Sequence, residues 1–178
     1  MDEDKLKAEF EYRDGFPPCL IYVDAEGDWY HKGARIIRKD ILKIFYDNLQ
    51  LTDTGLYVIK LKNEQCYIEV ADTPFVIQQT NIETGDSEDS AYFLITLKNT
   101  NEIEKLDPST LWVGENNVLY CLVREGKFPA RFSRPAYYQL ATHIEEDSEN
   151  GAFYLISNGT KYYIRNSPPE SLPEAIKS

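Results

Sequence analysis

The chain has 178 residues, which suffices for one ordinary domain or two small ones. Its 30 acidic side chains outnumber its 19 basic ones and give a formal net charge of −11. Because the phosphates of nucleic acids and anionic membranes repel such a chain, the charge argues against nonspecific binding to DNA, to RNA or to a membrane surface.

The first half of the chain is predicted to form short strands around one helix. The run "CLIYVD", the turn signal "AEGD" and "WYHK" predict a hairpin over residues 19–32. A second hairpin is predicted over residues 55–71, where "GLYVIKLK" and "QCYIEVA" flank Asn63 and Glu64. Between them a helix is predicted over residues 39–49 from an apolar stripe: Ile41, Leu42, Ile44, Phe45 and Leu49.

The second half continues this mixture of hairpins and helices. Residues 74–83 and 91–98 predict a third hairpin, joined by the acidic loop "TGDSEDS". The end of the chain is rich in Pro and Ser, which predicts a flexible tail over residues 167–178. A second helix is predicted over residues 134–145, where apolar residues recur at helical spacing: Tyr137, Leu140, Ala141 and Ile144.

The sequence repeats itself at an offset of 96 residues. At this offset, Ala34, Arg35 and Arg38 align with Ala130, Arg131 and Arg134. Without a gap, the same offset places Gly55 on Gly151. Such a repeat predicts an α+β fold of two similar halves, each a small antiparallel sheet with one helix. The predicted units are residues 1–98, which include an added hairpin, and residues 99–166.

Arginines stand in front of both predicted helices. A helix N-terminus carries about half a positive charge, so a cation there is unfavourable unless something negative lies nearby. A ligand phosphate or carboxylate could be held by an arginine together with free backbone N–H groups. The alternative is an ion pair with one of the 30 carboxylates of the chain. The candidates are Arg35, Arg38, Arg131 and Arg134, of which Arg38 and Arg134 lie nearest the helix starts.

The stretch "EVADTPFVI" joins two predicted strands and contains further candidates. Pro74 cannot donate to a strand ladder, so it marks a bend, a bulge or an edge. Asp72 just before it suits an Asx turn, or it faces a cleft where the two halves meet. In the second interpretation, Asp72 and Phe75 form the wall of the anion site to which the arginines contribute.

No signature of an enzyme or a metal site is present. The two histidines, His31 and His143, have no Ser or Cys partner that spacing can assign, and no metal-ligand spacing occurs. There is no Gly-rich phosphate loop either. We therefore expect no catalytic residue, no metal and no cofactor.

The three cysteines, Cys19, Cys66 and Cys121, are odd in number and lie in apolar runs, so we expect buried free thiols and no disulfide. The charged start "MDEDKLKAEFEY" is unlike a signal peptide, and no apolar run approaches the ~20 residues of a membrane helix. These features predict a cytoplasmic protein.

Taken in order, "AEGDWYHKGARIIR", "VADTPF" and "ARFSRPAYYQL" resemble the pattern of the bacterial domain of unknown function 1285 family. The resemblance spans residues 21 to about 165, and the order of these motifs carries it. It implies a duplicated α+β protein whose C-terminal half superficially resembles a pleckstrin-homology fold. It also implies a small-ligand site, nucleotide-like in character, between the halves and a role in signalling.

Two classes of function follow. The first is a non-catalytic ligand-binding or sensory protein that holds an anionic, nucleotide-like molecule. The second is a protein–protein adaptor without a small-molecule ligand, which presents aromatic strands and an acidic surface to a protein partner. An exposed apolar patch would favour the adaptor.

Overall fold

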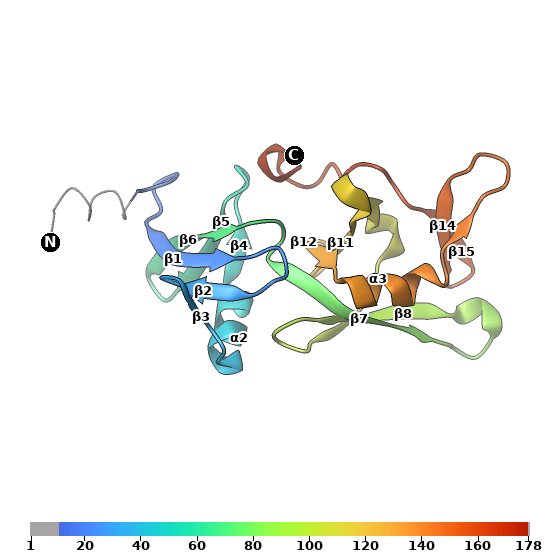
Figure 1. Cartoon of the computed structure of the whole chain (residues 1–178), viewed down its shortest axis with the longest axis horizontal. Helices are drawn as coiled ribbons and strands as arrows, with labels where there is room; N and C mark the ends of the chain where they lie inside the picture. The colour runs from blue at the N-terminus through green and yellow to red at the C-terminus, as the bar shows by residue number, and fades with distance from the viewer. Residues whose placement is uncertain (1–10, 178) are drawn as a thin grey trace, which may run out of the picture. The chain divides into compact units, whose positions relative to one another are not determined.

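The structure, a computed structural model, describes residues 11–177 and divides into two compact units (Figure 1). The first unit contains the chain up to Asp72 together with the segment from Pro173, and the second is Thr73–Leu172. The chain thus divides at a different place from the predicted boundary at residue 98. The segment predicted as a flexible tail contains the buried Leu172 and a short 3-10 helix, η4 (Glu174–Ile176).

One mixed sheet of six strands forms the first unit: β1 (Pro18–Val23), β2 (Trp29–His31), β3 (Ala34–Arg35), β4 (Leu49–Leu51), β5 (Tyr57–Leu61) and β6 (Glu64–Val70). Their order is β3-β2-β1-β6-β5-β4. All neighbours are antiparallel except the central pair, β1 and β6, which is parallel. The chain therefore makes two three-stranded meanders, and the first strand lies beside the last.

A single helix, α2 (Lys39–Asp47), connects the two meanders and covers buried residues of the first unit. Leu42 and Tyr46, one turn apart, are its buried side chains. Tyr46 meets Trp29 of β2 edge to face at 4.9 Å between ring centroids. The predicted helix over residues 39–49 is thus present, two residues shorter than expected.

The second unit contains another mixed sheet of six strands: β7 (Phe75–Glu83), β8 (Tyr92–Leu97), β9 (Ile103–Lys105), β10 (Trp112–Val113), β11 (Leu119–Val123) and β12 (Phe128–Phe132). Their order is β10-β11-β12-β7-β8-β9, and only the central pair, β12 and β7, is parallel. Again the first strand of the sheet lies beside the last.

Helix α3 (Arg134–Ala141) follows β12 and packs on β7. Ser133 caps its N-terminus, since the Ser133 hydroxyl accepts the N–H of Ala136 at 3.3 Å. Gln139 of α3 accepts the N–H of Thr80 in β7 at 2.7 Å, which fixes the helix to the sheet. A separate three-stranded sheet comes next: β13 (Glu145–Glu146), β14 (Phe153–Ser157) and β15 (Thr160–Tyr163).

The protein is therefore an α+β protein with two similar halves, as the sequence predicts. The sheets are mixed, whereas purely antiparallel sheets were expected. In each sheet the first and last strands along the chain form a parallel pair, which no local sequence pattern predicts. The sequence offset also has a structural counterpart, since the register Val58↔Tyr67 of one hairpin recurs as Tyr154↔Tyr163 in the other. The two hairpins nevertheless occupy different settings, one within a six-stranded sheet and one within the three-stranded sheet.

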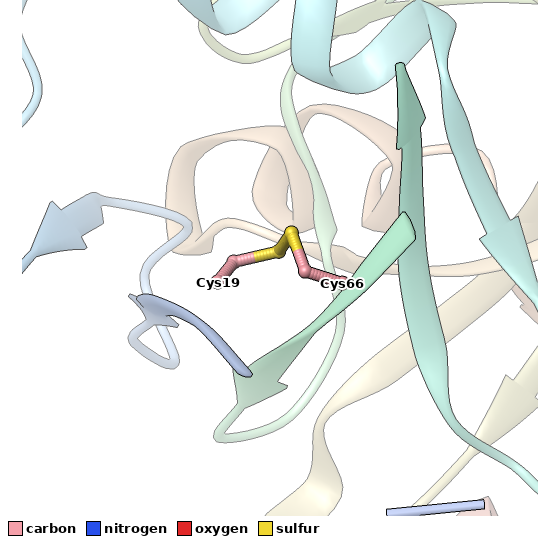
Figure 2. The surroundings of a disulfide bond; sticks show 2 residues. All are labelled: Cys19 and Cys66. Atoms are coloured by element: carbon pink, nitrogen blue, oxygen red, sulfur yellow. A yellow bond between two sulfur atoms is a disulfide. The ribbon is translucent and has the colours of Figure 1, made fainter. Parts of the chain in front are cut away.

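The prediction of three free cysteines is wrong, because Cys19 and Cys66 form a disulfide (Figure 2). Cys19 lies in β1 and Cys66 in β6, and their Cα atoms are 5.0 Å apart, within the usual range for a disulfide. The two strands are neighbours only because of the parallel pairing, and 47 residues separate the cysteines in sequence. Cys121 is free and buried, as expected.

Within residues 11–177, no helix combines the length and the apolar character that crossing a membrane requires.

Candidate ligand-binding site

A cavity of about 860 Å³ lies on the first unit, which is the size of a site for a small organic ligand. We call it the aromatic cavity, because three tyrosines line it: Tyr22, Tyr30 and Tyr67. Its lining comprises Glu11, Arg13, Pro18, Leu20, Ile21, Tyr22, Asp24, Tyr30, Lys32, Gly33, Tyr67 and Glu69.

Strand register brings the three tyrosines to this cavity. Tyr22 of β1 pairs directly with Tyr30 of β2, and their ring centroids are 6.3 Å apart. Tyr22 is also paired with Glu69 of β6, and Tyr67 lies on the same face as Glu69 because it is two residues away along the strand. The rings therefore form an apolar surface on which a planar group could stack.

Two of the three hydroxyl groups are already hydrogen bonded. Tyr67 is buried and donates to the carbonyl oxygen of Glu11 at 2.7 Å. Tyr30 donates to Asp24 at 3.2 Å, and desolvation followed by this hydrogen bond raises the pKa of Tyr30. The hydroxyl of Tyr22 has no hydrogen-bond partner among residues 11–177, so it can serve a ligand.

Two of the charged side chains in the wall, Arg13 and Glu69, form an ion pair with each other. The Arg13 guanidinium donates to Glu69 at 3.0 Å and lies 4.9 Å from the centre of the Tyr67 ring. The Asp24 carboxylate accepts the N–H groups of Glu26 at 3.0 Å and Asp28 at 2.9 Å. The Arg13–Glu69 pair is neutral overall, whereas the N–H groups that bond Asp24 orient its carboxylate without cancelling its charge.

Lys32 is the cation that remains available. Its side chain is exposed, and its ammonium group has no partner within the part of the chain that the structure describes. Lys32 and Gly33 form the turn between β2 and β3 with φ values of 48° and 82°, as a type I′ hairpin turn requires. The Lys32 N–H donates to the carbonyl oxygen of Leu20 at 3.0 Å, which ties this turn to β1.

Leu20 lies in an irregular part of β1. The register with β6 shifts between Pro18 and Tyr22, and Leu20 has a φ of 62°, a left-handed conformation that a leucine rarely adopts. The bulge directs Leu20 and Tyr22 into the lining of the aromatic cavity.

None of the six residues predicted as a ligand site lines this cavity, and they are divided equally between the two units. In the first unit, Arg35 pairs with Asp28 at 2.9 Å, and Arg38 forms a fork with Asp40 at 3.3 and 2.7 Å. The Arg38 hydrogen bond holds the pKa of the Asp40 carboxyl below its usual range. For these two arginines, the alternative of an internal ion pair describes the structure.

Asp72 and Phe75 belong to different units. Asp72 is half-buried at the end of the first unit. Burial raises the pKa of the Tyr57 hydroxyl, and the charge of Asp72 raises it further. Phe75 of β7 is 1% exposed and packs on Phe128 at 5.2 Å between centroids, so its ring belongs to the core of the second unit.

The remaining two arginines belong to the second unit. Arg131 is half-buried in β12, and its N–H donates to the hydroxyl of Thr73 at 3.1 Å. Arg134 is the first residue of α3 and is exposed, and it has no ion pair or hydrogen bond from its side chain among residues 11–177.

Sequence reasoning missed the residues of the aromatic cavity. The signal was present in the tyrosines of "CLIYV", "WYHK" and "QCYIEV", which lie on one face only after three strands are paired. For the two histidines, His31 lines a different, smaller cavity, and the His143 ring meets Phe93 edge to face at 5.3 Å. Among the described residues, no group of three or more His, Cys, Asp or Glu side chains is arranged to hold a metal ion.

Two solved structures share this fold. A DUF1285 family protein from Silicibacter pomeroyi DSS-3 matches with a TM-score of 0.69 and 19% sequence identity, over 84% of this chain and 81% of its own. A DUF1285 family protein from Shewanella baltica OS155 matches with a TM-score of 0.56 and 19% identity, over 69% of this chain and 91% of its own. No protein-family model and no curated protein matches the sequence. The chain thus has a DUF1285-like fold, as the sequence motifs predict.

Proposed function

We propose that the protein binds a small molecule without converting it chemically, and that the aromatic cavity is the binding site. The ligand is an anion that carries a planar ring, as a nucleotide does, and its binding has a sensory or signalling role. The observation that supports this most is the combination of tyrosine rings with an uncompensated lysine, Lys32, in the wall of one cavity.

Physical arguments connect these residues to such a ligand. A planar ring gains apolar contact and a favourable stacking geometry over Tyr22 and Tyr30. A protein of net charge −11 repels an anion at long range, so capture depends on a local cation. Lys32 supplies that cation, and the free hydroxyl of Tyr22 adds a hydrogen bond.

The proposal includes a cytoplasmic location and excludes nucleic acids and membranes as partners, in keeping with the acidic composition. The Cys19–Cys66 disulfide bears on the proposed cytoplasmic location. Reducing compartments keep most cysteine pairs as thiols, so in the cytoplasm Cys19 and Cys66 would be exposed to reduction.

Calorimetric titration with adenosine and guanosine mono- and diphosphates tests the proposal. Lys32→Gln is expected to weaken binding by about ten- to a hundredfold, because a hydrogen bond from a charged group contributes about 1.5–3 kcal/mol. Lys62→Gln is the matched control, since Lys62 is an exposed lysine with φ of 53° in the turn between β5 and β6 and does not line the cavity.

A second variant separates ring stacking from charge. Tyr22→Leu is expected to weaken the binding of nucleotides more than that of ribose 5-phosphate, which has no base and can lose only the hydrogen bond from the Tyr22 hydroxyl. Absence of any nucleotide binding, or equal effects of Lys32→Gln and Lys62→Gln, would overturn the proposal.

The adaptor function is the second candidate, and it is favoured by exposed apolar side chains on the second unit. Tyr138 of α3 is 60% exposed, and Phe153 and Ile156 of β14 are 53% and 48% exposed. A protein partner that protects these side chains from oxidative footprinting, with no nucleotide bound in the cavity, would favour the adaptor.

A further inference from the structure

The Cys19–Cys66 disulfide links β1 to β6 in the first unit (Figure 2). Both cysteines are half-buried, and both line a second cavity in the first unit, of about 380 Å³, which we call the disulfide cavity. The rest of its wall is mostly apolar and includes Ile41 and Phe45 of α2. Cys121, in contrast, is fully buried in β11.

The disulfide holds the irregular part of β1 against β6. Cys19 is followed directly by Leu20, which lines the aromatic cavity and accepts the N–H of Lys32 at 3.0 Å. The pairing of β1 with β6 is interrupted between Pro18 and Tyr22. Cys19 lies within this interruption, so the disulfide links the two strands where their backbone pairing is missing. The disulfide is thus the covalent link next to Leu20, to which the Lys32 turn is hydrogen bonded.

Backbone pairing on both sides of the bulge does not involve the disulfide. The Tyr67 N–H donates to the carbonyl oxygen of Pro17 at 2.9 Å, and the Ala71 N–H donates to that of Val23 at 2.9 Å. Opening the disulfide should consequently loosen the bulge and leave the sheet paired.

We propose that Cys19–Cys66 is a reversible thiol–disulfide exchange site for a small thiol, and that its opening loosens the wall of the aromatic cavity. The exchange rests only on two half-buried cysteines and the cavity that both of them line. Its effect on a bound ligand rests on the proposed function.

The chemistry is ordinary exchange between sulfur atoms. The thiolate of the small thiol attacks one cysteine Sγ, a new S–S bond forms, and the Cys19–Cys66 bond breaks with its electron pair on the departing sulfur. A second molecule of the small thiol then attacks the mixed disulfide. The two small thiols leave as a disulfide of their own, and the second cysteine is released as a thiol. In total two thiols are oxidised, the protein disulfide is reduced by two electrons, and the two thiol protons end on Cys19 and Cys66.

Counting thiols under native conditions tests the exchange. The oxidised full-length protein is incubated with a graded excess of reduced glutathione, alkylated without denaturant and analysed by intact mass spectrometry. We expect two alkylated cysteines, Cys19 and Cys66, while Cys121 stays unmodified and serves as the internal control. A disulfide that persists until the protein is denatured would overturn the proposal.

Amide hydrogen exchange followed by NMR tests the coupling to the aromatic cavity without any ligand. Reduction is expected to accelerate exchange of the Lys32 N–H by up to about tenfold, because its bond to Leu20 weakens. Exchange in α3, in the second unit, should not change. Loss of protection throughout α2 and β5 would show that the disulfide holds the fold of the unit, and unchanged exchange at Lys32 would show no coupling; either result overturns the proposal.

A double variant, Cys19→Ser with Cys66→Ser, provides a second measure of the reduced state. It should reproduce the exchange pattern of the reduced protein and be insensitive to glutathione. Nucleotide titration of the oxidised and reduced proteins completes the test, with weaker binding expected after reduction. If neither form binds a nucleotide, the proposed function fails, whereas the thiol count and the amide exchange still decide the exchange site.

Discussion

The indole nitrogen of Trp29 donates a hydrogen bond to the hydroxyl of Tyr46 over 2.8 Å, and both side chains are 1% exposed. The bond joins β2 to α2, the helix that connects the two meanders of the first unit. It is the polar contact in a cluster that also contains Phe45, whose ring stacks on Trp29 at 6.0 Å between centroids.

Replacing Tyr46 with Phe should therefore destabilise the protein. The substitution keeps the ring and removes the acceptor, which leaves a buried indole N–H without a partner at a cost of about 1–3 kcal/mol. Urea denaturation followed by tryptophan fluorescence measures the change. Tyr138→Phe, at a side chain that is 60% exposed, is the control and should change the free energy of unfolding by less than about 0.5 kcal/mol. Equal effects of the two variants would contradict this assignment.

Gly55→Ala should destabilise the protein more than Gly126→Ala. Both glycines have left-handed backbones, with φ of 89° and 79°, so each alanine costs about 1–2 kcal/mol. A Cβ at Gly55 would also lie 2.8 Å from the Cβ of Ala175, whereas nothing lies within 4 Å at Gly126. Overpacking adds about 1–3 kcal/mol at Gly55. Chemical denaturation of the two variants compares them, and equal midpoints would show that residues 173–177 do not pack there.

Arg35→Gln and Arg134→Gln should differ in their effect on stability. Arg35 pairs with Asp28 at 2.9 Å, but its side chain is 59% exposed, so the variant should lose no more than about 1 kcal/mol. Arg134 has no partner among residues 11–177, and its variant should stay within about 0.5 kcal/mol of the parent. Thermal unfolding at low and high salt checks this, since only the Arg35 effect should shrink with salt.

Arg38→Gln should change a carboxyl titration. The hydrogen bond from Arg38 is the largest cause that lowers the pKa of Asp40, and the positive charge of Arg38 adds to it. Without the guanidinium, the pKa of Asp40 should move up toward its ordinary value. NMR titration of the carboxyl carbons measures it, with Asp147, whose pKa is lowered mainly by the Tyr163 hydroxyl, as the reference that should not move.

Glu104→Gln should alter how stability depends on pH. Burial raises the pKa of Glu104 above its ordinary value of 4.5, although the N–H and charge of Arg124 act in the opposite direction. A raised folded-state pKa means that the native state binds the proton more tightly, so stability falls as pH rises through the interval above 4.5. Glutamine has no carboxyl group to titrate, so the variant lacks this pH dependence. Its free energy of unfolding should gain on that of the parent as pH rises, and a constant difference from acid to neutral pH would contradict the prediction.

Local structure in this protein follows closely from local sequence. The hairpin around Asn63 was predictable because alternating apolar residues flank a two-residue turn, and α2 was predictable from its apolar stripe. The parallel pairing of β1 with β6 was not predictable in this way, because the two strands are brought together by the whole intervening chain. The disulfide and the aromatic cavity both depend on that pairing, so both were missed. Arg35 and Arg38 were singled out from the sequence, but their partners, Asp28 and Asp40, could not be chosen among the 30 carboxylates from the sequence alone.

The packing of Ala175 against Gly55 has a consequence for biosynthesis. The first unit is completed by residues 173–177, which the ribosome adds only after all of the second unit has been made. During translation the sheet of the first unit can pair early, yet its surface at Gly55 remains uncovered until the second unit has emerged. A nascent chain stalled before residue 173 should therefore carry a paired but incompletely covered first unit, open to chaperones and proteases at that surface.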